Sequence, residues 1–240
     1  MQERIEYDSI GALAVPTEAY YGVQTLRAKE NFYITGRKLD SDFIVSLVQV
    51  KKAAALTNYE TGDLNKTIAD AIIAACNDII AGKFHDQFIV DPIQGGAGTS
   101  SNMNANEVIA NIAIEKLGGR KGDYNMVHPN DHVNMSQSTN DVYPTAGKIT
   151  ALKLTQKMLF QLERLGEVLK LKSIEFDNII KVGRTQLQDA VPMRLGQSFK
   201  AFFSAIQRDA KRVKRNQSEL YIVNMGGTAI GTAINANPDY

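Results

Sequence analysis

Between Pro144 and about residue 180 the chain contains almost no glycine or proline, and its residues follow one long repeat. The repeat alternates steps of three and four residues through Thr155, Met158, Leu162, Leu165, Leu169, Lys172, Phe176 and Ile179. This spacing predicts an α-helix with a heptad-like seam and one polar interruption. A helix of about 37 residues rises about 55 Å, more than a compact domain of this length needs.

A second long helix is predicted over residues 193–222, where apolar residues recur with the same spacing. The polar, proline-containing segment 181–192 joins the two and favours an antiparallel helical hairpin. Two helices cannot cover each other's apolar surface on all sides, so we expect further helices from other subunits or from a longer chain. We also expect this sequence to be a fragment of a longer protein or one half of an assembly, because only a glycine-rich turn follows the second helix.

The first half predicts three shorter helices. One starts at Asp40-Ser41 and stops at Thr61-Gly62, a second covers residues 66–81, and a third runs from about Met103 to Gly118. Residues 1–40 show no clear period and are interpreted as an extended arm with short turns. Strands are scarce, with residues 88–90 a short extended candidate. The predicted fold class is therefore mainly α with minor β content.

Composition excludes several classes of protein. The chain has 27 Lys and Arg against 26 Asp and Glu, a net charge of +1 that gives no long-range field for nucleic acid or an anionic membrane. No apolar run approaches the roughly 18 residues of a membrane span. The single cysteine, Cys76, excludes an intramolecular disulfide framework, and the N-terminus is too charged for a signal peptide. We expect a cytoplasmic protein without nucleic-acid or membrane partners.

Four segments rich in Gly, Ser, Thr and Asn lie at the breaks between apolar helices, namely residues 95–107, 128–141, 183–189 and 226–232. A helix N-terminus presents unpaired N–H groups and a partial positive charge, which suits an anion. Capping and turn chemistry would explain any one of these segments alone. Four of them in one helical chain favour a site for a small molecule with more than one carboxylate.

Other chemistries are less well supported. His128 and His132 are four residues apart, but Pro129 and Asn130 favour a turn between them, and no HExxH motif or cysteine partner is present, so no metal site is predicted. The glycine run at 95–98 lacks the Lys-Ser/Thr ending of a phosphate-binding loop. The basic residues at 208–215 share their helix with acidic ones and are interpreted as a solvated face.

At the polar segments the sequence resembles the fumarase/aspartase superfamily, and within it the aspartate ammonia-lyase branch. The similarity extends over essentially all 240 residues and is carried by Val15-Pro16, Ala19-Tyr20-Tyr21-Gly22-Val23-Gln24-Thr25, Gly96-Ala97-Gly98-Thr99-Ser100, Ser138-Thr139-Asn140-Asp141-Val142-Tyr143 and Gly183-Arg184-Thr185-Gln186-Leu187-Gln188-Asp189-Ala190. Fumarases tend to carry Gly-Ser-Gly-Thr-Gln-Thr at the first active-site segment and His at the position of Gln186. Both differences favour the aspartase branch.

The resemblance implies a long-helix bundle whose central domain forms a homotetramer with a 20-helix core and active sites shared by three subunits. In this scheme residues 1–140 form an N-terminal lyase domain, and residues 141–240 form the first part of the central helical-bundle domain. The rest of that domain and the C-terminal domain lie outside the sequence.

The implied reaction is a reversible anti-elimination without cofactor or metal, which converts L-aspartate to fumarate and ammonia. Its difficulty is the charge that gathers on an enediolate-like carboxylate, which requires preorganised donors. By the resemblance, Thr99, Ser138 and Thr139 match positions that hold this carboxylate. Asn140 matches a position near the departing amino group, and Thr185 and Gln186 match positions that contact the other carboxylate or the amine.

One part of the family's pattern is absent. The family's general base is a serine in a Gly-Ser-Ser loop, followed by Met-Pro and by Lys and Asn that bind substrate, and none of these occurs in residues 1–240. No catalytic residue is therefore assigned in this chain, and the chain alone is expected to be inactive. His128, Asn130 and Asp131 match a second anion site of fumarases and are not placed in the catalytic step. A fumarase, or a non-catalytic fragment that only oligomerises, remains as an alternative.

Overall fold

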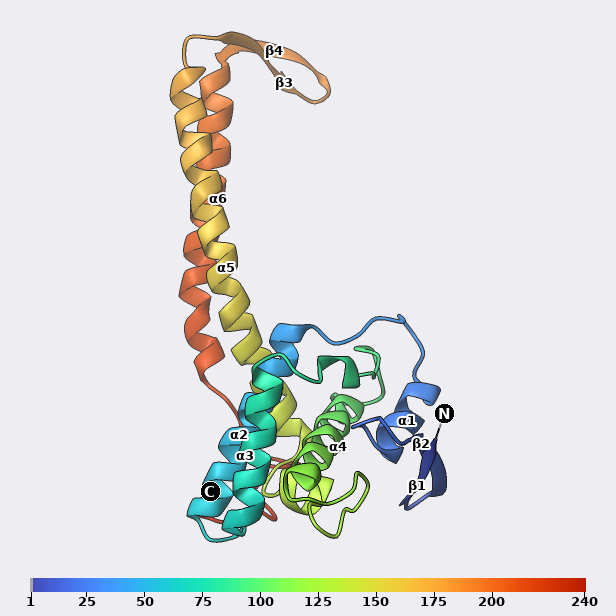
Figure 1. The fold of residues 1–240 in the computed structure, drawn as a ribbon. Helices are drawn as coiled ribbons and strands as arrows, with labels where there is room; N and C mark the ends of the chain where they lie inside the picture. Colours follow the sequence, from blue (N-terminus) through green and yellow to red (C-terminus); the bar gives the residue numbers. More distant parts are fainter. Residues whose placement is uncertain (1) are drawn as a thin grey trace. The chain divides into compact units, whose positions relative to one another are not determined.

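The computed structural model describes residues 2–240, which divide into two compact units. The first contains the residues up to Thr150 together with Val223–Tyr240, and the second contains Ala151–Ile222. Helices dominate both, and the strands form only two separate two-stranded sheets (Figure 1). The prediction of a mainly helical chain with little β structure is confirmed. None of the helices in residues 2–240 has both the length and the apolar content that crossing a bilayer requires.

Three helices form the core of the first unit: α2 (Ser41–Glu60), α3 (Lys66–Ile80) and α4 (Thr99–Lys116). The first two begin where the sequence predicts, because the side chains of Asp40 and Asn65 accept hydrogen bonds from backbone N–H groups of the first turns. Leu47, Ile72 and Ile109, one from each helix, are completely buried among them. These contacts hold α4 in the middle of the unit.

Helix α4 starts at Thr99, four residues before the predicted start. Gly98 precedes it with a φ of 94°, a left-handed conformation that glycine adopts at little cost. The helix is also richer in buried amides than an apolar stripe suggests. Asn104 accepts a hydrogen bond from Ile89 N–H and donates one to the Gln87 carbonyl. The prediction of an extended stretch at 88–90 is wrong, because this side chain, not a neighbouring strand, pairs with the backbone there.

Residues 2–40, the described part of the predicted arm, are more regular than predicted. Strands β1 (Glu3–Asp8) and β2 (Gly11–Pro16) form an antiparallel hairpin, and helix α1 (Val23–Asn31) follows. The carboxylate of Asp8 accepts hydrogen bonds from the N–H groups of Ile10 and Gly11 and so closes the turn. The Arg4 guanidinium donates to the carbonyls of Pro16, Thr17, Ala19 and Tyr21. A single cation thus organises a segment whose sequence has no period.

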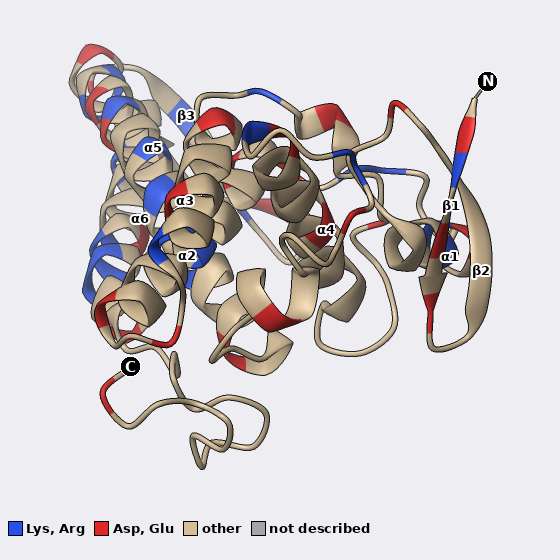
Figure 2. Cartoon of the chain, turned by 60° about the horizontal axis from the view of Figure 1, so that its bottom comes forward, with Lys and Arg blue, Asp and Glu red and all other residues tan. Residues whose placement is uncertain are grey.

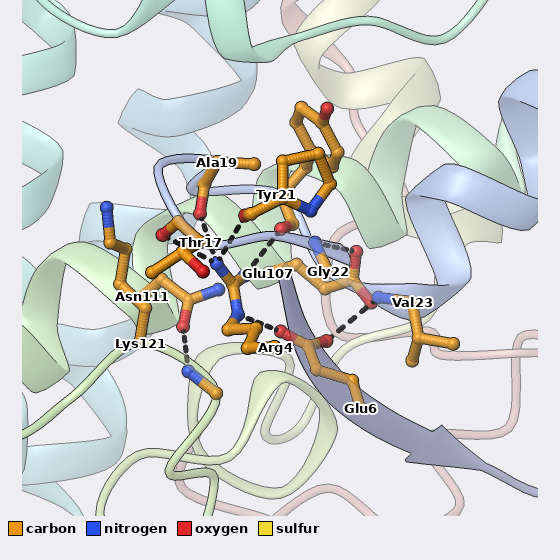
Figure 3. A network of polar contacts seen from close by, with 12 residues as sticks. Arg4, Glu6, Thr17, Ala19, Tyr21, Gly22, Val23, Glu107, Asn111 and Lys121 are labelled. Carbon is orange, nitrogen blue, oxygen red and sulfur yellow. Dashed lines mark hydrogen bonds and ion pairs between the residues drawn. The ribbon is translucent and has the colours of Figure 1, made fainter. Parts of the chain in front are cut away.

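The N-terminus of α1 is capped by carboxylates from elsewhere in the unit (Figure 3). Glu107 of α4 accepts hydrogen bonds from the N–H groups of Gly22, Gln24 and Thr25 at 2.8, 2.9 and 3.1 Å. Burial raises the pKa of Glu107, and these donors oppose the rise by stabilising its charged form. Glu6 accepts from Val23 N–H at 2.9 Å. The arrangement ties the N-terminal hairpin and α1 to the centre of α4.

The second unit contains most of the long helix α5 (Thr139–Glu175) and all of α6 (Leu195–Asn216). The sequence predicts a start at Pro144 and an end near 180, but the helix begins five residues earlier and ends five residues earlier. Pro144 lies inside the helix and has no N–H to offer the Asn140 carbonyl. That carbonyl accepts a hydrogen bond from the Asn224 side chain at 3.0 Å instead, which explains why the helix tolerates the proline.

The polar connection predicted at 181–192 is a second β-hairpin, of β3 (Ile180–Thr185) and β4 (Gln188–Arg194), so Ile180 belongs to a strand. The second predicted helix ends at Asn216, and a short 3-10 turn over Gln217–Tyr221 replaces its last turn. Helices α5 and α6 lie side by side in Figure 1, and the rings of Phe176 and Phe199 pack with centroids 5.2 Å apart.

This pairing covers only part of the apolar surface of the second unit. Met158 and Leu165 of the predicted seam are 43% and 45% exposed. Large side chains outside the seam are also exposed along α5, including Phe160, Val168, Leu171 and Ile174. The basic residues at 208–215 are exposed on α6 as expected of a solvated face, and Arg212 pairs with Asp209. Figure 2 shows Lys and Arg positions in blue recurring along α6.

We expect Glu107→Gln to lower the free energy of unfolding by about 1–3 kcal/mol, because one oxygen becomes an NH₂ group that faces N–H donors in a buried place. Denaturant titration of the two proteins measures the difference. Glu60→Gln, at the exposed end of α2, is the matched control and should change stability little. Equal stability of Glu107→Gln and the parent chain would contradict a capping role for this carboxylate.

Candidate functional site

A cavity of about 660 Å³ lies in the first unit at the N-terminus of α5. Three of the four polar segments meet there. The lining residues are Asn102, Met103, Asn130, Asp131, Asn134, Met135, Ser136, Gln137, Ser138, Thr139, Thr228, Ala229, Ile234 and Asn235. These three polar segments therefore line one cavity, although parts of them lie up to about 130 residues apart in the sequence.

The first turn of α5 is held by a reciprocal cap. The Ser138 hydroxyl accepts a hydrogen bond from Asn140 N–H at 3.2 Å, and the Asp141 carboxylate accepts one from Ser138 N–H at 2.9 Å. The other oxygen of Asp141 accepts from Thr228 N–H at 2.9 Å. Asp141 is completely buried, so it fixes the loop 226–232 against the helix start.

The predicted site residue Asn140 joins the same contact. Its side-chain N–H donates to the Ala229 carbonyl at 2.7 Å, although the residue as a whole is exposed. Asn140 therefore positions the loop that forms one wall of the cavity and does not itself line it.

The N-termini of α4 and α5 are adjacent. Asn102, one turn into α4, donates from Nδ2 to the Thr139 hydroxyl oxygen at 3.1 Å. Gly98, just before α4, lies so close to the Tyr143 ring that a Cβ atom there would collide with it. Two helix N-termini thus direct their partial positive charges toward one region. Thr99, the first residue of α4, is exposed and does not line the cavity.

Several buried acceptor atoms of cavity-lining residues have no hydrogen-bond partner among the described residues. They are Asn102 Oδ1, Gln137 Oε1 and Thr228 Oγ1, and the residues Asn102 and Thr228 are 2% and 6% exposed. Buried polar atoms normally find partners, so these three mark places beside the cavity wall where an internal water could complete the hydrogen bonding. Thr228 also has a φ of 56°, a conformation that costs energy in a residue with a branched side chain.

A buried cation lies next to the cavity. Lys51 of α2 is completely buried, and its Nζ donates to Asn134 Oδ1 at 2.7 Å. Burial lowers the pKa of Lys51 to about 7, while the charge of Asp141 acts in the opposite direction. The Lys51 charge and the two helix N-termini together make the surroundings of the cavity suited to an anion.

Thr185 and Gln186 belong to the second unit and are exposed at the turn between β3 and β4. Gln186 and Leu187 have φ angles of 50° and 61°. A two-residue hairpin turn with both central residues in the left-handed region normally uses Asn and Gly, so this turn is strained.

His128 and His132 are bound to backbone groups near them. His128 Nδ1 accepts from the N–H groups of Asn130 and Asp131, and His132 Nδ1 accepts from His128 N–H. The turn predicted at Pro129 and Asn130 is present, as a π-helical turn over Pro129–Val133. In the part of the chain that the structure describes, no three His, Cys, Asp or Glu side chains gather as a metal site would require.

Sequence reasoning did not identify the parts played by Lys51, Asn102 and Asn134 beside the cavity. Asn102 follows Thr99 by three residues and would share its helix face, but the predicted helix start at Met103 hid this relation. Lys51 carries no comparable signal, because a lysine in a helix is usually exposed.

The sequence profile of the lyase family matches residues 11–240 of this chain. The chain belongs to that family. Its membership of the fumarase/aspartase superfamily agrees with the motifs at the polar segments.

Known relatives agree with this membership. An aspartate ammonia-lyase of Bacillus subtilis is 56% identical over 237 residues, which are 99% of this chain and 50% of the relative. A crystal structure of a fumarate lyase:delta crystallin from Brucella melitensis, bound to cobalt, superposes with a TM-score of 0.93 at 52% identity and covers 100% of this chain and 52% of that one. A class II fumarase from Schistosoma mansoni gives a TM-score of 0.90 at 39% identity, over 99% of this chain and 50% of that one. The chain thus spans about half the length of the relatives that it matches.

We expect the stability of the chain to rise relative to Lys51→Met as the pH increases from about 7 to 10.5. Above the folded-state pKa of about 7, the unfolded chain still binds the proton that the folded chain has released, so raising the pH favours folding. Below pH 7 the two proteins should differ by a constant amount. Denaturant titrations at several pH values measure this difference, and a pH-independent difference throughout would contradict the lowered pKa.

Proposed function

We propose that this chain supplies substrate-binding groups to an ammonia-lyase that converts L-aspartate reversibly to fumarate and ammonia. The observation that carries the proposal is the cavity where the α5 N-terminus meets α4, with Ser138 and Thr139 on its wall. This combination of hydroxyl donors, helix N-termini and a buried cation suits a carboxylate. The 56% identity to an aspartate ammonia-lyase supports the choice of reaction.

In the proposed reaction, Ser138 and Thr139 donate hydrogen bonds to the carboxylate on which negative charge gathers when the β-proton leaves. Thr99, at the start of α4 and outside the cavity lining, matches a third position of this donor set in the family's pattern. Donors fixed before the reaction stabilise the enediolate-like state without having to reorganise. By the family's pattern, Asn140 matches a position near the departing amino group, and Thr185 and Gln186 match positions that contact the other carboxylate or the amine.

We also propose that this carbon–nitrogen lyase works as a cytoplasmic homotetramer, without metal or cofactor, and that one active site draws on several subunits. The exposed apolar side chains along α5 support oligomerisation, because large exposed apolar surfaces are typical of protein–protein contacts. The proton-abstracting serine would come from residues outside this chain, so the 240-residue chain alone should not turn over substrate.

The closest alternative reaction is the hydration of fumarate to malate. The similarity to a class II fumarase favours this possibility at the level of the fold. Gln186, at the position where fumarases carry His, favours the ammonia-lyase.

We expect the protein expressed over its full natural reading frame to release ammonia and fumarate from L-aspartate, and Thr139→Val to lower kcat/KM by about 10²–10³-fold through the loss of one donor. Fumarate absorbance and an ammonia assay measure both products. Thr139→Ser keeps the hydroxyl and should recover most of the activity. Malate formation without aspartate turnover would instead identify a fumarase, and helical assembly with neither activity would identify an oligomerising scaffold.

A further inference from the structure

Lys51 lies one layer below the cavity wall. Its side chain has no exposed surface. Among the described residues, Nζ makes one hydrogen bond, to Asn134 Oδ1 at 2.7 Å. Asn134 lines the cavity, whereas Lys51 does not. Burying a cation is costly unless it is paired, so its presence here calls for a role beyond packing.

The ammonium fixes the orientation of Asn134. Below its pKa of about 7 Lys51 is an ammonium, which can only donate hydrogen bonds, so the Asn134 amide presents its oxygen to Lys51. The same oxygen accepts a hydrogen bond from Asn102 Nδ2 at 3.1 Å, and Asn134 Nδ2 donates to the Gln137 carbonyl at 3.3 Å. A reversed amide would place N–H groups against both Lys51 and Asn102.

Asn102 connects Asn134 to Thr139 on the cavity wall through hydrogen bonds from its Nδ2. With Nδ2 directed at Asn134, its second N–H donates to the Thr139 hydroxyl oxygen at 3.1 Å. The Thr139 hydroxyl oxygen therefore accepts its hydrogen bond from the Asn102 side chain. Its own proton is left to donate to a group in the cavity that Thr139 lines.

We propose that Lys51 is a positioning residue, whose ammonium sets the hydrogen-bond directions of Asn134 and Asn102 so that the Thr139 hydroxyl donates into the cavity. The identity of the bound group depends on the function proposed above, but the orientation of the two amides does not. The competing explanation is that Lys51 only fills space and offsets the buried charge of Asp141.

The first test measures the amides directly in the chain itself. Asn102 and Asn134 side-chain NH₂ resonances are assigned from their loss in Asn102→Asp and Asn134→Asp. Lys51→Met should shift both pairs of resonances. Lys52→Met, the matched control on the same helix, should leave them in place. Unchanged resonances in a folded Lys51→Met protein would overturn the proposal.

If Lys51→Met does not fold, variants of Asn134 provide the same test. Asn134→Asp keeps an oxygen for both Lys51 and Asn102, so the Asn102 resonances should stay near their original positions. Asn134→Leu removes the acceptor and should shift them. Equal Asn102 spectra in these two variants would contradict the proposed order of contacts.

The second test asks whether Lys51 acts through Thr139, with L-aspartate turnover by the protein of full natural length. Lys51→Met should lower kcat about 10–100-fold, the size seen when groups that orient a ligating residue are removed. In a Thr139→Val background the same change should have almost no further effect, because the hydroxyl that it positions is gone. A full additional loss in that background would show a general structural role and overturn the proposal.

The two tests separate this inference from the proposed function. Absence of aspartate turnover in the unmodified full-length protein would refute the function and leave the amide measurement to decide the role of Lys51. Normal turnover with unchanged amides in Lys51→Met would refute the positioning role alone.

Discussion

Two buried carboxylates hold the first unit together, because each accepts hydrogen bonds from backbone N–H groups at the start of a helix. Glu107 does so for α1 and Asp141 for α5. Glu107 thereby attaches Gly22–Thr25 at the start of α1 to α4, and Asp141 also attaches Thr228 to α5. Helix starts are the points where backbone donors are free, so they are also the points where distant segments can be joined.

The same property explains why the cavity forms where it does. Where the starts of α4 and α5 come close together, polar side chains gather from several loops. Below its pKa of about 7, the buried Lys51 beside this region adds a positive charge that has no contact with solvent. The same hydrogen bonds around Lys51, Asn102 and Asp141 therefore stabilise the unit and shape the proposed anion site.

Much of the fold could be predicted from the sequence. The bounds of α2 and α3 followed from their caps and apolar spacing, and the polar segments indicated the region of the cavity. The N-terminal hairpin could not be predicted, because Arg4 organises it through carbonyl groups that leave no trace in the side-chain pattern. The start of α5 was missed because Pro144 is normally a first-turn residue, and the distant Asn224 compensates for it here. The assignment of substrate contacts to Thr99, Ser138, Thr139, Asn140, Thr185 and Gln186 stays a prediction, and so does the division at residue 140.

The contact between Asn224 and the Asn140 carbonyl has a consequence for how the protein can vary. Together with the bonds of Ala229 to Asn140 and of Thr228 to Asp141, it returns the chain to the same spot from which α5 departs. The chain therefore leaves the first unit along α5 and re-enters it after residue 222 at one hydrogen-bonded cluster, formed by Asn140, Asp141 and residues 224–229. Homologues could gain or lose the same number of helical turns in α5 and α6 without any change in the hydrogen bonds of this cluster.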